Sequence, residues 1–288
     1  MNKPRVALVI GIFCISVFPI LVKLSLAPGV ISAFYRMLFS LVFLLPYVIL
    51  TKQFKVSNLK TTLLAVLCGV LFGSDVAVWN IAIQESTATQ ASLLTNLSPV
   101  WVGFLALFFL KDKPKVNFWI GTIIAVLGMV ILVGFSVFKN LDFDLAFYFG
   151  VLSGVLYAFY MLISKQVLKT LNVLTFMTLT LLASSTHLAI VSYVLNQPFY
   201  GFSTTGWFVL GIQALFCQLL AWLLISYATK YMRATRVSVS LLGQGILASI
   251  LAWLFIGETI TLQMVFGGFV LLLGIAVTFY EKPLIRIK

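Results

Sequence analysis

Asp75 is the first candidate for chemistry in this sequence, because it is the only acidic residue well inside a long apolar stretch. A carboxylate in the middle of a bilayer costs about 2.5–3.5 kcal/mol on insertion scales, so its presence needs a reason. One reason is functional: the carboxylate binds a ligand ammonium, or it takes up and releases a proton. The other is structural: the carboxylate pairs with Arg36 or Lys23, the basic residues expected in the same half of the membrane.

Arg36 is the matching candidate for binding an anionic group, and it shares a helical face with Ser32 and Ser40. Its guanidinium could hold a carboxylate through two parallel hydrogen bonds. The alternative is that the long side chain extends toward the outer membrane surface and keeps its charge in water. Four aromatic residues could form a box around a flat or cationic ligand: Trp79, Tyr157, Tyr160 and Trp222.

Other polar residues recur at spacings of three and four, so each set lies on one face of a helix. Because unpaired polar groups are costly in lipid, we expect these faces to line a cavity or to contact another helix. The sets are Ser92, Thr95, Asn96 and Pro99; Ser153, Tyr157, Tyr160 and Ser164; Gln218, Trp222 and Ser226; Ser240 and Gln244; and Asp75 with Trp79. The predicted substrate-binding residues are Asp75, Trp79, Arg36, Asn96, Thr95, Tyr157, Tyr160, Trp222, Gln218 and Gln244, and Asp75 is also the candidate for proton coupling.

The sequence contains no cluster that would suit catalysis or metal binding. His187 is the only histidine, and we expect a lone histidine to be a hydrogen-bonded packing residue rather than a proton relay. Cys14, Cys68 and Cys217 lie in apolar stretches without CxxC or CxxH spacing, which is typical of small packing residues. Without an HExxH motif, a nucleophile elbow or an ATP-binding loop, we expect no enzyme activity, no metal and no cofactor.

The composition places all these residues in a membrane. Of 288 residues, 62% are hydrophobic and only 9% are charged, with a mean hydropathy of +1.13, whereas soluble domains carry about a quarter charged residues. A membrane-spanning helix needs roughly 20 mostly apolar residues. Ten such segments are predicted, at 5–26, 31–50, 61–83, 88–110, 116–138, 145–168, 173–195, 205–229, 234–256 and 260–280. The expected fold is therefore an all-α integral membrane protein, with 5–26 as an uncleaved first helix.

The basic residues orient this arrangement. If the N-terminus lies in the cytoplasm, 16 of the 19 Lys and Arg residues fall on the cytoplasmic side, as the positive-inside rule requires. The outer loops then receive Glu85, Asp142, Asp144 and Glu258, with Lys139 as their only cation. We therefore expect a multi-pass protein of the inner (plasma) membrane with both termini in the cytoplasm. The net charge of +12 is spread over short loops, so nucleic-acid binding is not expected.

An internal repeat divides the chain. A shift of 146 residues aligns the third to fifth predicted helices with the eighth to tenth without a gap, so that Leu105-Ala106 matches Leu251-Ala252, and Gly121 and Gly128 match Gly267 and Gly274. Because a unit of five helices is odd, the second copy must enter the membrane inverted. Inverted repeats are typical of alternating-access transporters, which hold their substrate near the midplane. We expect the two copies at 1–138 and 145–280.

Small residues indicate which helices pack closely. The fifth and tenth predicted helices are rich in glycine and nearly free of polar side chains, so we expect both at the periphery, in close contact with a neighbour. The pairs Gly69 with Gly73 and Gly150 with Gly154, each four residues apart, are expected to set helix contacts rather than ligand contacts.

These features together resemble a known family. The stretch from Ala82 to Val133, AIQESTATQASLLTNLSPVWVGFLALFFLKDKPKVNFWIGTIIAVLGMVILV, and its mate ending ILAWLFIGETITLQMVFGGFVLLLGIAV resemble the EamA repeat of the drug/metabolite transporter superfamily. The shared pattern is an alanine-rich helix start, a proline in the fourth helix, an acidic residue after it and a glycine-rich last helix. Lys23 and Arg36 also look like family positions, whereas Lys111-Asp112 stands where Gly-Glu is usual, as in Gly257-Glu258. The resemblance covers essentially the whole chain and implies a ten-helix, two-repeat carrier.

The resulting functional hypothesis is a secondary transporter that exports amino acids or related small metabolites by alternating access, with coupling to protons through Asp75. The first alternative keeps the fold and reverses the flux: uptake of a nucleoside-like cofactor or another preformed metabolite. A membrane-embedded enzyme is a remote alternative, because no catalytic cluster supports it. A purely structural or assembly protein is the last, and the polar faces and the inverted repeat argue against it. The expected partners are a small-molecule substrate and the lipid bilayer.

Overall fold

The computed structural model describes residues 3–24, 27–85, 94–110, 113–134, 145–257 and 259–280, and this part of the chain is entirely helical apart from its connections. The elements are α1 (Lys3–Ser16), α2 (Phe18–Leu24), α3 (Gly29–Leu50), α4 (Leu59–Glu85), α6 (Ser98–Phe109), α7 (Val116–Val133), α8 (Leu145–Val167), α9 (Val173–Val194), α10 (Thr204–Ile212), the π-helix η2 (Gln213–Leu220), α11 (Ala221–Tyr231), α12 (Ala234–Leu241), α13 (Gln244–Ile256) and α14 (Leu262–Phe279).

These elements confirm the predicted all-α membrane fold. Among the described residues, nine helical segments are long and apolar enough to cross a membrane, and the shorter apolar helix α6 lies in the predicted segment 88–110. Several sequence predictions fall outside the described atoms: Ser92, Lys111, Asp112, Lys139, Asp142, Asp144 and Glu258, together with the side chains of Lys23 and Glu85.

Contacts between the two halves occur in matching pairs. The third span, α4, packs on α8 of the sixth span, just as α11 of the eighth span packs on α1 of the first. The second span packs on the seventh through α3 and α9, and the fifth packs on the tenth through α7 and α14. This exchange of equivalent partners is what an inverted pair of five-helix repeats produces, and it buries the polar faces between the repeats.

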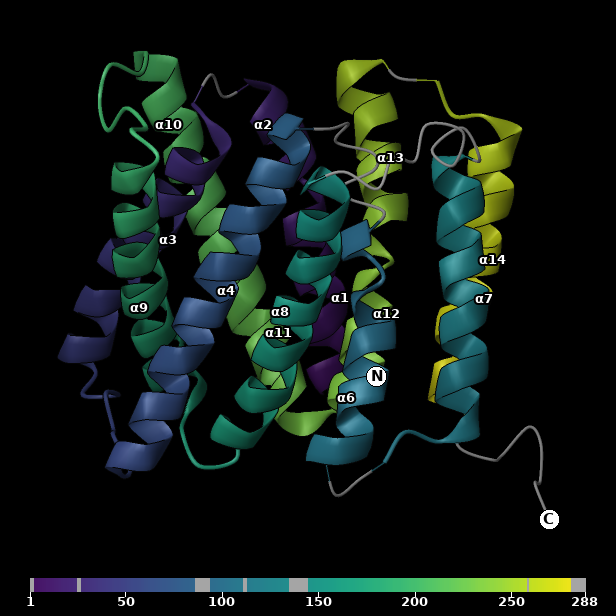
Figure 1. The fold of residues 1–288 in the computed structure, drawn as a ribbon, viewed down its shortest axis with the longest axis horizontal. Coiled ribbons are helices and arrows are strands. Elements are labelled where there is room, and N and C mark those ends of the chain that lie inside the picture. Colours follow the sequence, from purple (N-terminus) through teal and green to yellow (C-terminus); the bar gives the residue numbers. More distant parts are fainter. Residues whose placement is uncertain are drawn as a thin grey trace.

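The fifth and tenth spans form the peripheral pair that their glycines predict. Figure 1 shows α7 and α14 side by side at one edge of the bundle. A Cβ added to Gly121 would lie 2.6 Å from the carbonyl oxygen of Gly274, and one added to Gly128 would lie 2.9 Å from that of Gly267. Only glycine permits this approach of the two backbones, because any side chain would separate them.

Three spans predicted as continuous helices are interrupted, and two of the interruptions match across the repeat. The chain turns at Asn96-Leu97 before α6 and again at Leu242-Gly243 between α12 and α13, positions that are 146 residues apart. The third interruption separates α1 from α2 at Val17. Pro19 accounts for it, because proline lacks the amide hydrogen and its ring would clash with the carbonyl of residue 15 in a straight helix.

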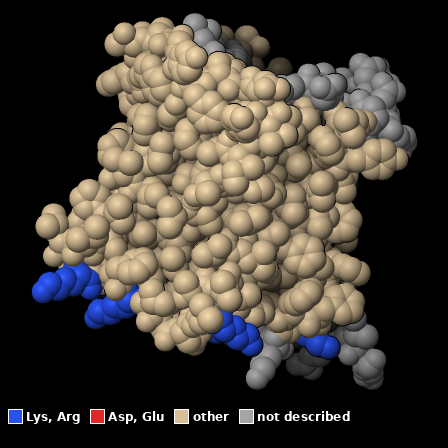
Figure 2. Space-filling view, turned by 60° about the vertical axis from the view of Figure 1, so that its left-hand side comes forward, with Lys and Arg blue, Asp and Glu red and all other residues tan. Residues whose placement is uncertain are grey.

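The basic residues gather at one end of the bundle, which we term the basic face. It comprises the connections and adjoining helix ends that contain Lys52, Lys55, Lys60, Lys113, Lys115, Lys165, Lys169, Lys230 and Arg233. Figure 2 shows the Lys and Arg side chains of one side of the molecule together at this end. Such segregation of charge is typical of the positive-inside rule.

Candidate functional site

A cavity of about 310 Å³ lies between the two halves of the bundle. Nine of the ten predicted binding residues line it: Arg36, Asp75, Trp79, Thr95, Asn96, Tyr157, Gln218, Trp222 and Gln244. They come from seven segments distributed over both repeats, so the cavity exists only when the repeats are assembled. The helical spacing of three and four therefore identified the inward faces, because in lipid a polar face must meet protein or a cavity.

Asp75 is fixed by a neighbouring helix. Its Oδ1 accepts a hydrogen bond of 2.5 Å from the hydroxyl of Ser153 on α8, and the Ser153 and Thr95 hydroxyls lie 3.1 Å apart. Asp75 is only 6% exposed, and within the described part of the chain no basic side chain forms an ion pair with it. The structural pairing with Arg36 is therefore not present. A buried carboxyl without a countercharge can exist as the neutral acid, or as the anion when a cation is bound.

Arg36 lies at the same cavity with most of its donors uncommitted. Its side chain is 7% exposed, and its guanidinium carbon lies 4.2 Å from the ring centroid of Phe18. The Nε atom has no hydrogen-bond partner among the described residues. The burial excludes the alternative in which this side chain extends to the membrane surface. What remains is a desolvated guanidinium beside an aromatic ring, with its donors available to an anionic group in the cavity.

Aromatic rings form the end of the cavity that is nearer to the basic face. The Trp222 ring centroid lies 4.6 Å from that of Phe72 and 6.3 Å from that of Tyr157. Tyr160 does not line this cavity; it packs behind these rings, with its ring centroid 4.9 Å from that of Phe72 and 5.9 Å from that of Trp222. One helical turn decides this, because Tyr160 is one turn closer than Tyr157 to the basic end of α8. We term Phe72, Tyr157, Tyr160 and Trp222 the aromatic floor.

Between the aromatic floor and the basic face, two lysines connect helix ends through hydrogen bonds. The Lys165 ammonium donates to the carbonyls of Thr229, Lys230 and Met232 at 2.8, 2.9 and 2.7 Å. The Lys230 ammonium donates to the carbonyl of Leu171 at 2.9 Å. Because the last carbonyls of a helix have no partner within it, an ammonium placed there stabilises the end. These bonds join α8, α11 and the α8–α9 turn at the basic face.

Interrupted helices supply several lining positions that helical spacing alone did not predict. Residues around the Pro19 break (Ile15, Ser16, Phe18 and Pro19) line the cavity, as does Gly245 just after the break at Leu242-Gly243. Cys217 also lines it from η2, next to Gln218. Pro19 and the Gly243-x-Gly245 pair are visible sequence signals for the breaks, whereas no residue pattern marks the π-helix.

The remaining polar and glycine predictions concern packing. His187 Nε2 lies 3.0 Å from the hydroxyl of Ser74, which is the geometry of a hydrogen-bonded packing residue between α9 and α4. A Cβ added to Gly69 would lie 2.5 Å from the carbonyl oxygen of Thr180, and one added to Gly150 would lie 2.9 Å from Leu94. These glycines therefore set helix contacts, as expected from their spacing.

Comparison with known proteins places this architecture in a family. The pattern of the EamA-like transporter family matches residues 4–134 and again residues 145–280. The uncharacterized transporter YdfC of Bacillus subtilis (strain 168) is 27% identical over 254 residues, which cover 86% of this chain and 81% of YdfC. An S-adenosylmethionine uptake transporter of Rickettsia bellii is 30% identical, but over only 101 residues and 34% of each chain.

A solved structure agrees at the level of the fold. One crystal structure superimposes with a TM-score of 0.81 over 96% of this chain and 98% of its own, at 13% sequence identity. At that identity the similarity concerns the fold alone. The family pattern, by contrast, is present once in each half and covers nearly the whole sequence. The chain is therefore a member of the EamA-like transporter family.

Proposed function

We propose that this transporter exports amino acids or closely related zwitterionic metabolites by alternating access. The observation that carries the proposal is the pair of opposite charges at one cavity: Arg36 and Asp75 both line it, and neither forms an ion pair within the described residues. An α-amino acid carries a carboxylate for the guanidinium and an ammonium for the carboxylate. Binding such a substrate would satisfy two buried groups that are costly to leave without partners.

The size of the cavity supports a small substrate. Its volume of about 310 Å³ is at the lower end of the roughly 300–1,000 Å³ range of small-molecule pockets. Gln218 and Gln244 lie at the wall from the second repeat and offer both donors and acceptors to a polar substrate. Both repeats thus contribute to binding, so a rocking movement of one against the other would change access without dismantling either contribution.

The closed basic face supports alternating access. The aromatic floor and the bonds of Lys165 and Lys230 lie on one side of the cavity, between Asp75 and the basic connections. If the basic face is cytoplasmic, as the positive-inside rule favours, this conformation is closed toward the cytoplasm. Transport then requires the floor to open while the opposite side closes, and the interrupted helices at the cavity supply hinges for that movement.

Proton coupling is assigned to Asp75. The carboxyl has one hydrogen bond, from Ser153, and no cation within the described residues. Loss of a proton at this position creates a buried charge that favours a substrate ammonium, and uptake of a proton removes it. The transmembrane proton gradient would thereby bias the direction of exchange between substrate and proton.

Uptake of a nucleoside-like cofactor is the second candidate. Two observations favour it: three of the predicted aromatic-box residues, Trp79, Tyr157 and Trp222, line the cavity, and the Rickettsia bellii relative is an S-adenosylmethionine uptake transporter. The flat base of a nucleoside can stack favourably on such rings. The two candidates differ in substrate and in the direction of net flux.

Counterflow in reconstituted vesicles tests both candidates. Vesicles loaded with one metabolite are mixed with a trace of the labelled compound, and protein-dependent accumulation is measured by mass spectrometry against protein-free vesicles. We expect accumulation for amino acids. Accumulation only for S-adenosylmethionine or nucleosides would identify the substrate class of the second candidate instead. No accumulation of any of these by folded, monodisperse protein would contradict both.

A further inference from the structure

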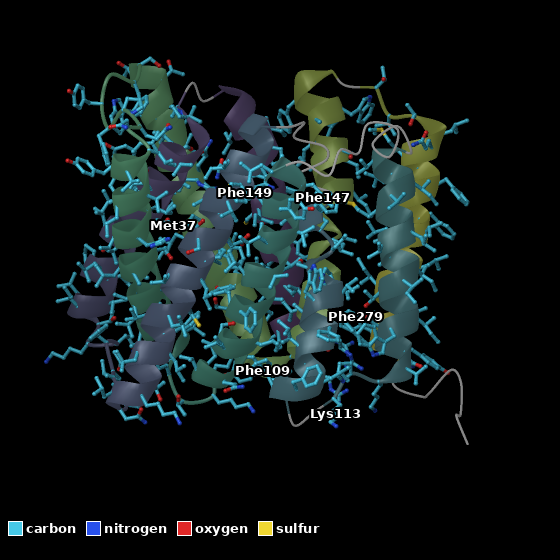
Figure 3. All side chains as sticks on the ribbon, in the orientation of Figure 1. Met37, Phe109, Lys113, Phe147, Phe149 and Phe279 are labelled. Atoms are coloured by element: carbon cyan, nitrogen blue, oxygen red, sulfur yellow. The ribbon has the colours of Figure 1, made fainter. Side chains whose placement is uncertain are left out.

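A second, larger cavity lies away from the substrate site, at the basic face. Its volume is about 560 Å³, and its lining includes Lys3, Arg5, Arg233, Arg236, Tyr231 and Phe279. The residues come from the start of α1, the end of α11, the start of α12, the connection between these two helices and the end of α14. The assembled fold is therefore needed to bring them together. Phe279 lies toward the end of the bundle at which Lys113 lies, and Phe147 lies toward the other end (Figure 3).

Two arginines are organised around one ring in this cavity. The guanidinium carbons of Arg5 and Arg236 each lie 5.5 Å from the centroid of the Phe279 ring. The Arg236 Nε also donates a hydrogen bond of 3.1 Å to the carbonyl of Thr278. An aromatic ring that packs against guanidinium groups restricts their conformations. The cations at this cavity are therefore positioned rather than randomly extended.

The local electrostatic field is positive from several sources. Four cationic side chains line the cavity, and none of its described lining residues is acidic. The N-termini of α1 and α12, which begin at Lys3 and Ala234, lie here and add the positive ends of two helix dipoles. The carbonyls at the end of α11 would oppose this field, but the Lys165 ammonium binds those of Thr229 and Met232. An anion is the ligand that this arrangement favours.

We propose that this cavity binds a phosphate group. Several convergent cations and guanidinium forks suit a phosphate, which offers more acceptor oxygens than a carboxylate. Two sources carry that chemistry: the headgroup of an acidic phospholipid, and phosphate dissolved in the adjoining water. The membrane surface is where headgroup phosphates lie, and basic pockets between helices there bind them. Val9, one turn beyond Arg5, is 56% exposed and would extend an apolar path for an acyl chain.

Native mass spectrometry of the full chain released from detergent tests the site. The probes are phosphatidylglycerol, phosphatidylcholine and inorganic phosphate, each added to delipidated protein. We expect retained adducts of phosphatidylglycerol but not of zwitterionic phosphatidylcholine. For Arg5→Gln/Arg233→Gln, we expect roughly 30-fold weaker phosphatidylglycerol binding, from about 1 kcal/mol lost per basic residue at the surface.

Matched variants separate the site from general surface charge. Lys55→Gln/Lys169→Gln removes two exposed lysines from the same basic face, and we expect it to bind phosphatidylglycerol as the wild type does. Arg5→Lys/Arg233→Lys keeps both charges and should retain most of the binding, which controls for misfolding of the Gln variant. Phosphate binding that needs no lipid and is lost in the Gln variant would assign the site to dissolved phosphate. The proposal would be overturned if both double Gln variants lost phosphatidylglycerol binding equally. It would also be overturned if the wild type retained phosphatidylcholine as well as phosphatidylglycerol.

Discussion

At the scale of single residues, Arg36 and Asp75, the two charged side chains that line the central cavity, differ in what holds them. Asp75 is oriented by a hydroxyl on another helix, through the bond from Ser153. Arg36 is held by packing: the Phe18 ring lies over its guanidinium, and α3 is fixed to η2 by the hydrogen bond from Ser40 to the carbonyl of Ala214 at 2.8 Å. A preorganised pair of opposite charges costs less rearrangement when a zwitterion binds.

The first prediction concerns Asp75→Asn. Asparagine keeps the shape and can still accept the Ser153 hydrogen bond through its side-chain oxygen, but it cannot lose a proton. Without the carboxylate the variant also binds the substrate ammonium more weakly. We therefore expect its counterflow to need a higher substrate concentration and its accumulation no longer to respond to a pH gradient. Both are measured in the same vesicles with an imposed gradient and with a collapsed one. If Asp75→Asn still accumulated substrate in response to the pH gradient, Asp75 would not be the residue that couples transport to protons.

The second prediction concerns Arg36. Its replacement by Gln removes the charge that would hold a substrate carboxylate, and a hydrogen bond to a charged group contributes about 1.5–3 kcal/mol. Because about 1.4 kcal/mol corresponds to a tenfold change, we expect the KM for amino acids to rise about 10- to 100-fold. Amino acid amides, which lack the carboxylate, should be transported equally by wild type and variant. If the variant lost transport of amino acids and of their amides to the same extent, Arg36 would have a structural role instead.

At the scale of the elements, breaks in helices and bonds between helix ends shape the cavity. Helix interruptions at Val17, Asn96-Leu97 and Leu242-Gly243 border it, and the π-helix η2 forms part of its wall. The α7–α14 pair, which reaches the cavity through Met129, has no interruption and almost no polar side chain. Movement is therefore expected where backbone hydrogen bonds are already rearranged, and rigidity where two backbones pack directly.

The third prediction concerns Lys165→Met. Methionine is similar in length but leaves the carbonyls of Thr229 and Met232 without their ammonium donor, which destabilises the closed basic face. Cys68 lies one turn from Phe72 on α4 and is 0% exposed, so it reports opening of the floor. In a background with Cys14 and Cys217 replaced by Ala, we expect faster reaction of Cys68 with a thiol reagent. The exposed Lys169→Met serves as the control, and equal rates in the two variants would contradict the prediction.

The fourth prediction concerns Gly128→Val in the peripheral pair. Its side chain would meet the backbone of Leu271 and the carbonyl of Gly267, and overpacking of this kind costs about 1–3 kcal/mol. We expect a lower melting temperature of the purified protein, with near-normal counterflow per folded molecule because the added methyl groups would meet α14 rather than the cavity. Leu127→Val, at a neighbouring exposed position, should leave the melting temperature unchanged. A Gly128→Val protein as stable as the wild type would show that the two helices can separate freely.

At the scale of the whole molecule, two halves related by inversion share one cavity. Their basic residues are not distributed according to this inversion. The matching contacts of α4 with α8 and of α11 with α1 relate the repeats, and the equivalent helices run in opposite directions. The described loop cations nevertheless gather on one face, which the basic connections form. Packing is thus conserved under inversion, whereas charge is segregated by the side of the membrane on which each loop lies.

The fifth prediction is the orientation of that face. In a background with the native cysteines replaced by Ala, Tyr200→Cys lies between α9 and α10, and Thr170→Cys lies on the basic face between α8 and α9. We expect a membrane-impermeant maleimide to label Tyr200→Cys in intact cells and Thr170→Cys only after permeabilisation. The reverse pattern would place the basic face outside and invert the assignment of the closed side.

The sequence by itself determined the spans, their count and the inward faces. Apolar length, charge segregation and the shift of 146 residues predicted ten helices in two inverted repeats, and nine of ten proposed binding residues line the cavity. These are local or periodic properties, and in lipid a polar helical face must contact protein or line a cavity. Only the tertiary structure decided the interruptions, the position of Tyr160 behind the floor, and the meeting of Arg5, Arg236 and Phe279. Those features depend on contacts between residues far apart in the chain, which no periodicity specifies.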